Sequence, residues 1–105
     1  MAKVKGAVIK ITSSGTVSTA NKAAILRGYT LIGGTTASKV IFNNGGSGGA
    51  DTYAGTTAAG TNVGDVTKSE NLVGGDGLGI IFNTDIYCTL SGTGAYAYVY
   101  YEEIG

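Results

Sequence analysis

Apolar and polar side chains alternate with a period of two residues along most of this chain, and helical periodicity is scarce. Because successive side chains of a strand point to opposite faces, this pattern predicts β-strands. The segments between them are rich in glycine and serine, which suits tight turns. We therefore predict an all-β fold, a single antiparallel β-sandwich or jelly roll of about eight short strands. The expected strands are residues 3–12, 24–33, 38–43, 51–58, 63–69, 78–83, 85–91 and 95–103.

Two stretches of the pattern need a separate interpretation. In residues 18–28, STANKAAILRG, Ser18 could cap a short helix that Gly28 ends. The apolar pattern continues from Ile25 to Ile32 as a strand, so we prefer a strand and keep the helix as the alternative. The similarity of VIFNN at 40–44 to IIFNT at 80–84 indicates two strands with the same turn chemistry rather than a duplication.

The last two expected strands suit a hairpin. If residues 85–91 and 95–101 pair around Gly92 and Thr93, one face is wholly apolar and the other carries tyrosines. The apolar pairs are Leu90 with Ala95, Cys88 with Ala97, and Ile86 with Val99. The outer pairs are Tyr87 with Tyr98, Thr89 with Tyr96, and Asp85 with Tyr100. This register predicts that Cys88 is a buried, unreactive thiol.

Tyrosines on an outer sheet face have three possible explanations. Tyrosine has a high β-propensity, so the rings could serve the sheet alone. They could also form a contact surface, because tyrosine is enriched at protein interfaces and four neighbouring rings make a contiguous patch. A sugar-stacking platform is the third, less favoured explanation, since only Asp85 and Glu102 are near as acidic partners. The candidate interface residues are Tyr87, Tyr96, Tyr98 and Tyr100.

Composition narrows the function. The 105 residues fit one domain, residues 1–105, and seven basic residues balance seven acidic ones. Neither a nucleic acid nor an anionic membrane is therefore favoured as a partner, and the lysines form no basic stripe. Only 13% of the residues are charged, so charge repulsion gives the chain little protection against association with other chains. We expect a chain that packs against other chains, including copies of itself.

The residue inventory argues against catalysis. Histidine is absent, the seven carboxylates are scattered over turns and ends, and no serine shows a distinctive spacing to a lysine. GGSGGAD at 45–51 and GGDGLG at 74–79 come close to a calcium-binding repeat or a phosphate-binding loop, but neither matches, and we interpret both as turns. We expect no enzyme activity, no cofactor and no metal.

The beginning of the sequence lacks the features of a signal peptide. Lysines at 3, 5 and 10 interrupt a short apolar run, so we expect cytoplasmic synthesis without export. No apolar run reaches the roughly 18 residues that a membrane-spanning helix needs, so no membrane association is expected.

Three segments carry a resemblance to a known class of proteins. VIKITSSGTV at 8–17, LRGYTLIGGTTASKVIFNN at 26–44 and IIFNTDIYCTLSGTGAYAYVYYEE at 80–103 resemble small β-sandwich virion structural proteins of tailed bacteriophages, whereas residues 45–77 fit least. The resemblance implies a jelly roll or sandwich without catalytic residues, located on the virion. It implies a role in decorating or cementing the capsid and, less often, a role in the tail.

Two functions follow as expectations. The first is a structural virion protein that contacts the major capsid protein, other virion proteins or further copies of the chain. The alternative is a carbohydrate-binding or adhesion module, including a tail-associated one, that uses Tyr87, Tyr96, Tyr98 and Tyr100.

Overall fold

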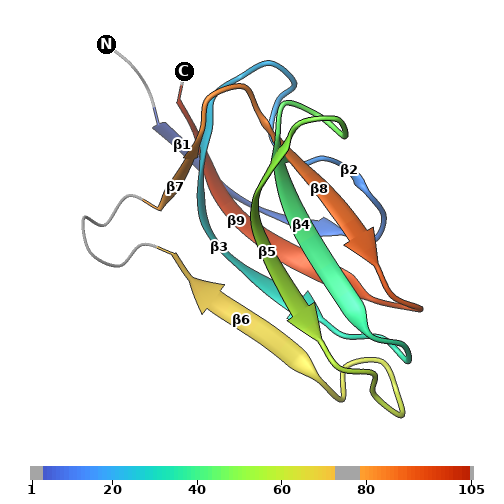
Figure 1. The fold of residues 1–105 in the computed structure, drawn as a ribbon. Helices are drawn as coiled ribbons and strands as arrows, with labels where there is room; N and C mark the ends of the chain where they lie inside the picture. Colours follow the sequence, from blue (N-terminus) through green and yellow to red (C-terminus); the bar gives the residue numbers. More distant parts are fainter. Residues whose placement is uncertain (1–3, 73–78, 105) are drawn as a thin grey trace.

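The computed structural model describes residues 4–72 and 79–104, and it confirms the all-β prediction. Within these residues there is no helix, and nine strands form two antiparallel sheets that pack face to face as a sandwich (Figure 1). Sheet A contains, in spatial order, β1 (Val4–Ile11), β9 (Tyr96–Ile104), β3 (Ala24–Ile32) and β6 (Thr67–Asn71), with β7 (Ile80–Phe82) beside β6 along the same edge of β3. Sheet B contains β2 (Gly15–Thr16), β8 (Ile86–Ser91), β4 (Ser38–Asn44) and β5 (Ala50–Thr57).

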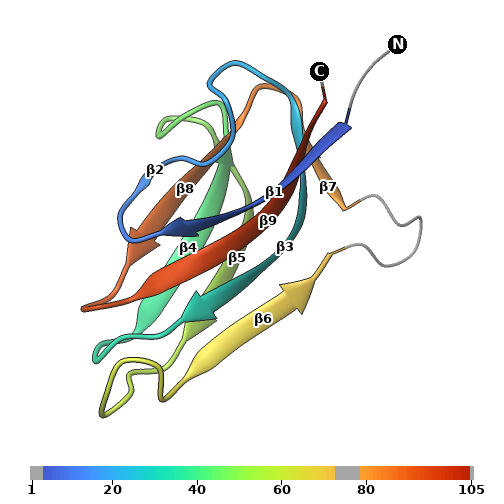
Figure 2. The same ribbon diagram turned by 180° about the vertical axis from the view of Figure 1, so that it is seen from behind.

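The connections define a jelly roll. Strands from the first half of the chain pair with strands from the second half, as β1 with β9, β2 with β8, β3 with β6 and β7, and β4 with β5. This long double ribbon is then rolled, so that β3 also pairs with β9 and β4 also pairs with β8. Figure 2 shows the result from the side of sheet A, with β9 lying between β1 and β3.

The strand positions differ from the predicted ones in two places. A short strand, β2, lies directly after the Ser13–Ser14 turn, where none was expected. The strand expected at 63–69 begins later, at Thr67, because the preceding residues form a turn. In that turn the Asn62 and Asp65 backbones are hydrogen bonded, and the Asp65 carboxylate accepts a bond of 2.9 Å from the Asn62 amide.

Residues 18–28 form a turn and the start of β3, so the helical alternative is wrong. The Ser18 hydroxyl does not cap a helix but accepts a hydrogen bond of 2.9 Å from the backbone amide of Ile86. Asn21 has a positive φ of 60°, and its amide donates to the Asp85 carboxylate at 2.9 Å. Contacts with residues far along the chain therefore decide the local structure here.

The two sheets bury one apolar core between them. An irregularity in β3 at Arg27 shifts its register against β9, so Leu26 and Tyr29 both point into the core although they are three residues apart. Burial of one large apolar side chain stabilises a fold by about 1.5 to 3 kcal/mol. The largest completely buried side chains include Tyr29, Phe42, Phe82, Leu26, Leu31, Ile86, Val40 and Val99.

The predicted hairpin between the last two long strands is wrong. β8 belongs to sheet B and pairs with β2 and β4, whereas β9 belongs to sheet A and pairs with β1 and β3. The turn with positive φ at Gly92 and Gly94 thus carries the chain from one sheet to the other. Because β8 and β9 lie on opposite sides of the core, their apolar side chains still face inward. The predicted burial of Cys88 is confirmed, and burial raises the pKa of its thiol to about 12.

Candidate interaction surface

Three of the four candidate tyrosines lie in a row along β9 on the outer face of sheet A. On β1, Val8 pairs with Tyr100 and Lys10 pairs with Tyr98. The rings of Tyr96 and Tyr98 meet edge to face with centroids 5.9 Å apart, and the Lys10 ammonium lies 4.7 Å from the centre of the Tyr96 ring. We call this surface the tyrosine face and define it by Val8, Lys10, Tyr96, Tyr98 and Tyr100.

The tyrosine face exposes two adjacent large hydrophobic side chains. Within residues 4–72 and 79–104, four large hydrophobic side chains are prominently exposed: Val8 at 63%, Ile81 at 50%, Val63 at 45% and Tyr100 at 38%. Two of these four, Val8 and Tyr100, are cross-strand neighbours on the tyrosine face. Ile81 pairs with Ile25 at the far edge of β3, and Val63 lies in the loop before β6. Clustered apolar exposure of this kind is typical of an interaction surface rather than of a free surface.

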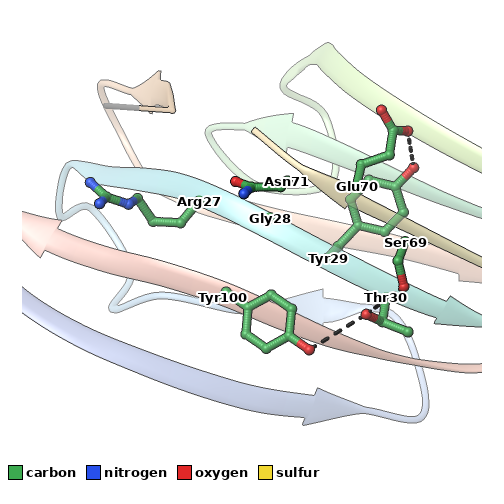
Figure 3. Close-up of a pocket in the computed structure, with 8 residues that line it drawn as sticks. All are labelled: Arg27, Gly28, Tyr29, Thr30, Ser69, Glu70, Asn71 and Tyr100. Carbon is green, nitrogen blue, oxygen red and sulfur yellow. Dashed lines mark hydrogen bonds between the residues drawn. The ribbon is translucent and has the colours of Figure 1, made fainter. Parts of the chain in front are cut away.

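Tyr100 stands between two open hollows of the outer face. The first hollow, shown in Figure 3, lies over Gly28 and is also lined by Arg27, Thr30 and residues 69–71 of β6. A Cβ atom at Gly28 would lie 2.7 Å from the Glu70 carbonyl oxygen and 3.5 Å from the Tyr100 ring, so only glycine leaves this space open. The second hollow is lined by Ala7, Val8, Arg27, Tyr100, Tyr101 and Glu102.

Polar contacts fix the surroundings of the Tyr100 ring. The Thr30 hydroxyl lies 3.4 Å from the Tyr100 hydroxyl and 2.9 Å from the Ser69 hydroxyl (Figure 3). The Arg27 guanidinium forms an ion pair of 3.6 Å with Glu102, and both side chains remain partly exposed, at 31% and 26%. The tyrosine row is thus bordered by one positive and one negative charge that a partner could reach.

Tyr87, the fourth candidate, does not join this surface. It lies on the outer face of sheet B, paired with Thr16 of β2 and Asn43 of β4, on the opposite side of the sandwich. The single patch of four tyrosines expected from the hairpin is therefore wrong. Period-two alternation identifies which residues point outward, but the outward direction of β8 is opposite to that of β9.

Asp85, which was expected to pair with Tyr100, is buried at the end of the sandwich instead. Its carboxylate accepts hydrogen bonds from the backbone amides of Asn21, at 2.9 Å, and Gly46, at 3.1 Å, so it joins two loops. The stretch at 45–51 contains a turn with positive φ at Gly45 and Gly46, as predicted. In the other stretch, 74–79, residues 74–78 lie outside the described part of the chain.

A polar cluster that the sequence did not reveal joins the two sheets at one side. The Tyr29 hydroxyl donates to Glu70 at 2.5 Å, and the Tyr53 hydroxyl donates to the other oxygen of the same carboxylate. These donors stabilise the ionised form and lower the pKa of Glu70, while burial and the neighbouring carboxylate raise the pKa of Tyr29. Both tyrosine hydroxyls donate to Glu70, so we interpret the cluster as a structural link between the two sheets.

Comparison with known proteins gives no family for this chain. No protein-family model matches the sequence, and no curated protein matches it either. Among the described residues, no three histidine, cysteine, aspartate or glutamate side chains are grouped in a way that could hold a metal ion. A search of the same residues for a helix long and apolar enough to cross a membrane found none.

Proposed function

We propose that this chain is a structural virion protein of a bacteriophage, and that it decorates or cements the capsid through protein–protein contacts of the tyrosine face. The observation that carries the proposal is the pair of exposed apolar side chains Val8 and Tyr100, which lie side by side and continue the row of Tyr96 and Tyr98 along β9. A tyrosine ring buries a large area at a small entropic cost, and its hydroxyl tolerates water before assembly.

The outer face of sheet B offers a contrast within the same molecule. Its outward positions on β4 and β8 include Lys39, Asn43 and Thr89, and Thr89 donates to Asn43 at 3.0 Å. Asn43 in turn donates to Asp51 at 2.5 Å. These polar side chains of sheet B bond to one another, whereas the outer face of sheet A exposes Val8 and Tyr100. This difference supports sheet A as the contact side.

The fold is consistent with this role by analogy. Jelly rolls occur in viral capsid proteins and also in lectins, so the topology alone does not assign a function. The resemblance of residues 8–17, 26–44 and 80–103 to small virion proteins favours the first of these classes. The mechanism would be mass action, because a chain that binds only the assembled shell stabilises the shell. At a free chain concentration of 100 times Kd, this stabilisation amounts to about 2.7 kcal/mol per site.

Binding to shells tests the proposal. The purified chain is mixed with capsid shells of its phage that lack it, and co-sedimentation with the major capsid protein is measured. We expect saturable binding that the double variant Tyr98→Thr, Tyr100→Thr weakens by about 1 to 4 kcal/mol per site, with the monomer still folded. The matched control is Tyr87→Thr, which removes a tyrosine from the opposite face and should leave binding unchanged. Absence of binding by the wild-type chain, or equal loss in the control, would contradict the proposal.

A carbohydrate-binding or adhesion function remains the second candidate because of the hollow over Gly28. The ring of Tyr100 borders it together with the hydroxyls of Thr30 and Ser69 and the amide of Asn71. An exposed ring beside hydroxyl and amide groups is suited to a neutral sugar. Binding of the isolated chain to a glycan array, abolished by Tyr100→Thr and retained in Tyr87→Thr, would favour this function over the first.

A further inference from the structure

Asn44 and Gly45 form the only Asn–Gly pair of the sequence, at the point where β4 ends. The five other asparagines precede a lysine, an asparagine, a valine, a leucine and a threonine. Asparagine is a chemically labile residue, because the nitrogen of the next peptide bond can attack its side-chain carbonyl carbon. A glycine in the next position favours this attack, since without a Cβ atom it neither shields its nitrogen nor restricts the backbone.

The Asn44 side chain is held in a position that assists such an attack. Its carbonyl oxygen Oδ1 accepts a hydrogen bond of 3.0 Å from the backbone amide of Thr84, in the segment between β7 and β8. Negative charge develops on this oxygen when a nucleophile adds to the carbonyl carbon, and a donor already directed at it stabilises that charge. Asn44 is only partly buried, so water has access to it.

The turn after Asn44 places Gly45 between two fixed points, beside the segment that joins β7 to β8 (Figure 1). On one side Thr84 holds the Asn44 side chain, and on the other the Asp85 carboxylate accepts a hydrogen bond of 3.1 Å from the Gly46 amide. Gly45 has a positive φ of 96°, and among the described residues beyond its chain neighbours the nearest atoms to a Cβ there belong to Thr84, at 3.8 Å. The Gly45 nitrogen therefore has room to turn toward Asn44 when the end of β4 frays.

We propose that Asn44 and Gly45 are a self-modifying site, at which the folded chain deamidates without an enzyme and the Thr84 amide stabilises the charge on the Asn44 oxygen. The Gly45 nitrogen forms a bond to Cγ of Asn44 and loses its proton, while the Cγ–Nδ2 bond breaks and the amide nitrogen leaves as ammonia. Water then opens the resulting cyclic imide at either of its carbonyl carbons, which leaves aspartate or isoaspartate at position 44. One water is consumed and one ammonia is released, with no oxidation or reduction.

The modification changes the charge of the chain and, in the isoaspartate form, its backbone. A carboxylate in place of the amide gives the otherwise neutral chain one additional negative charge. In isoaspartate the main chain runs through the side-chain carbon, so the end of β4 becomes longer where Asn44 pairs with Ala50 and Ile86. The site belongs to sheet B, whereas the tyrosine face belongs to sheet A, so this inference stands or falls independently of the proposed function.

Prolonged storage of the purified wild-type chain at mildly alkaline pH tests the site. The intact mass should rise by about 1 Da, and tandem mass spectrometry of peptides should place the change on Asn44. Asn43 and Asn62 are the internal controls and should stay unmodified. The gain of mass also separates this reaction from isomerisation of Asp76 before Gly77, which leaves the mass unchanged. A chain that gains no mass over several weeks, or that gains it first at another asparagine, overturns the inference.

The variant Val63→Gly tests the contribution of the structure. It creates a second Asn–Gly pair at Asn62, in the exposed turn before β6, where no backbone amide of the described residues donates to the asparagine side chain. Both pairs then react in the same molecules, so pH, temperature and the extent of folding are matched. We expect Asn44 to deamidate about ten times faster than Asn62 in the folded variant, and the two rates to converge in urea, where the bond from Thr84 is lost. Equal rates in the folded variant, or a faster reaction at Asn62, overturn the inference.

Discussion

The Glu70 carboxylate accepts hydrogen bonds from two phenols that belong to different sheets, Tyr29 on β3 and Tyr53 on β5. Lys68, on the same strand, adds a favourable charge. The sequence could not reveal this cluster, because the two tyrosines lie 41 and 17 residues away from Glu70 and neither spacing has a known meaning. By contrast, the burial of Cys88 was predictable, because alternation within one strand is a local signal.

The cluster should make stability depend on acid pH. The folded pKa of Glu70 is lowered, so its contribution is fully present above the ordinary pKa of about 4.5 and is lost as the pH falls through the lower folded value. Glu70→Gln should therefore cost about 1 to 2 kcal/mol at pH 7 and progressively less toward pH 3. Urea unfolding of both proteins at several pH values measures this difference. A cost that does not change with pH would show that ionisation of Glu70 does not stabilise the fold.

The thiol of Cys88 should react slowly in the native protein. Its pKa is raised from 9.0 to about 12, so the thiolate fraction at pH 8 falls by about three orders of magnitude, and the surrounding core blocks access as well. Stopped-flow labelling with a thiol reagent should be at least about a hundred times slower in buffer than in denaturant. Similar rates in the two conditions would mean that β8 does not face the core.

At the scale of the elements, the alternating pattern predicted most strand positions, but it did not predict which strands pair with each other. The turn at 92–94 fits a hairpin within one sheet as well as a passage between sheets, and both place Cys88 and Ala97 on inward faces. The choice depends on the pairing of β9 with β1 and β3, which is non-local. The same applies to the tyrosines: three were correctly grouped because they share β9, and Tyr87 was misplaced because its grouping required the hairpin.

The pairing of β3 with β6 should depend on Gly28. A methyl group there would lie 2.7 Å from the Glu70 carbonyl oxygen, so Gly28→Ala should push the strands apart and destabilise the fold by about 1 to 3 kcal/mol. Gly15→Ala is the control, since a Cβ at Gly15 of β2 meets nothing within 4 Å. Thermal unfolding compares the two variants. Equal melting temperatures would show that β6 adjusts without cost.

At the scale of the whole molecule, the structure bears out the predicted sandwich, whereas the virion role remains a proposal. The two sheets share one core made of residues from both halves of the chain, including Leu26, Phe42 and Val99. The packing of these apolar side chains is a major source of the stability of the fold.

Accordingly, the isolated chain should be β-rich and independent of metal. Its far-ultraviolet circular dichroism spectrum should lack helical bands, and addition of a chelator should leave both the spectrum and the melting temperature unchanged. Unfolding on addition of the chelator would contradict this prediction and would show that a bound metal ion stabilises the fold.

The central position of β9 in sheet A has a consequence for how the chain is made. Val4 pairs with Ile104, and β3 pairs along β9, so sheet A can be completed only after residues 96–104 have left the ribosome. Until then, β1 and β3 each expose an unpaired edge to other nascent chains. A fold dominated by such distant pairings forms slowly, in roughly milliseconds to seconds. Synthesis is therefore a stage at which open strand edges expose this protein to aggregation.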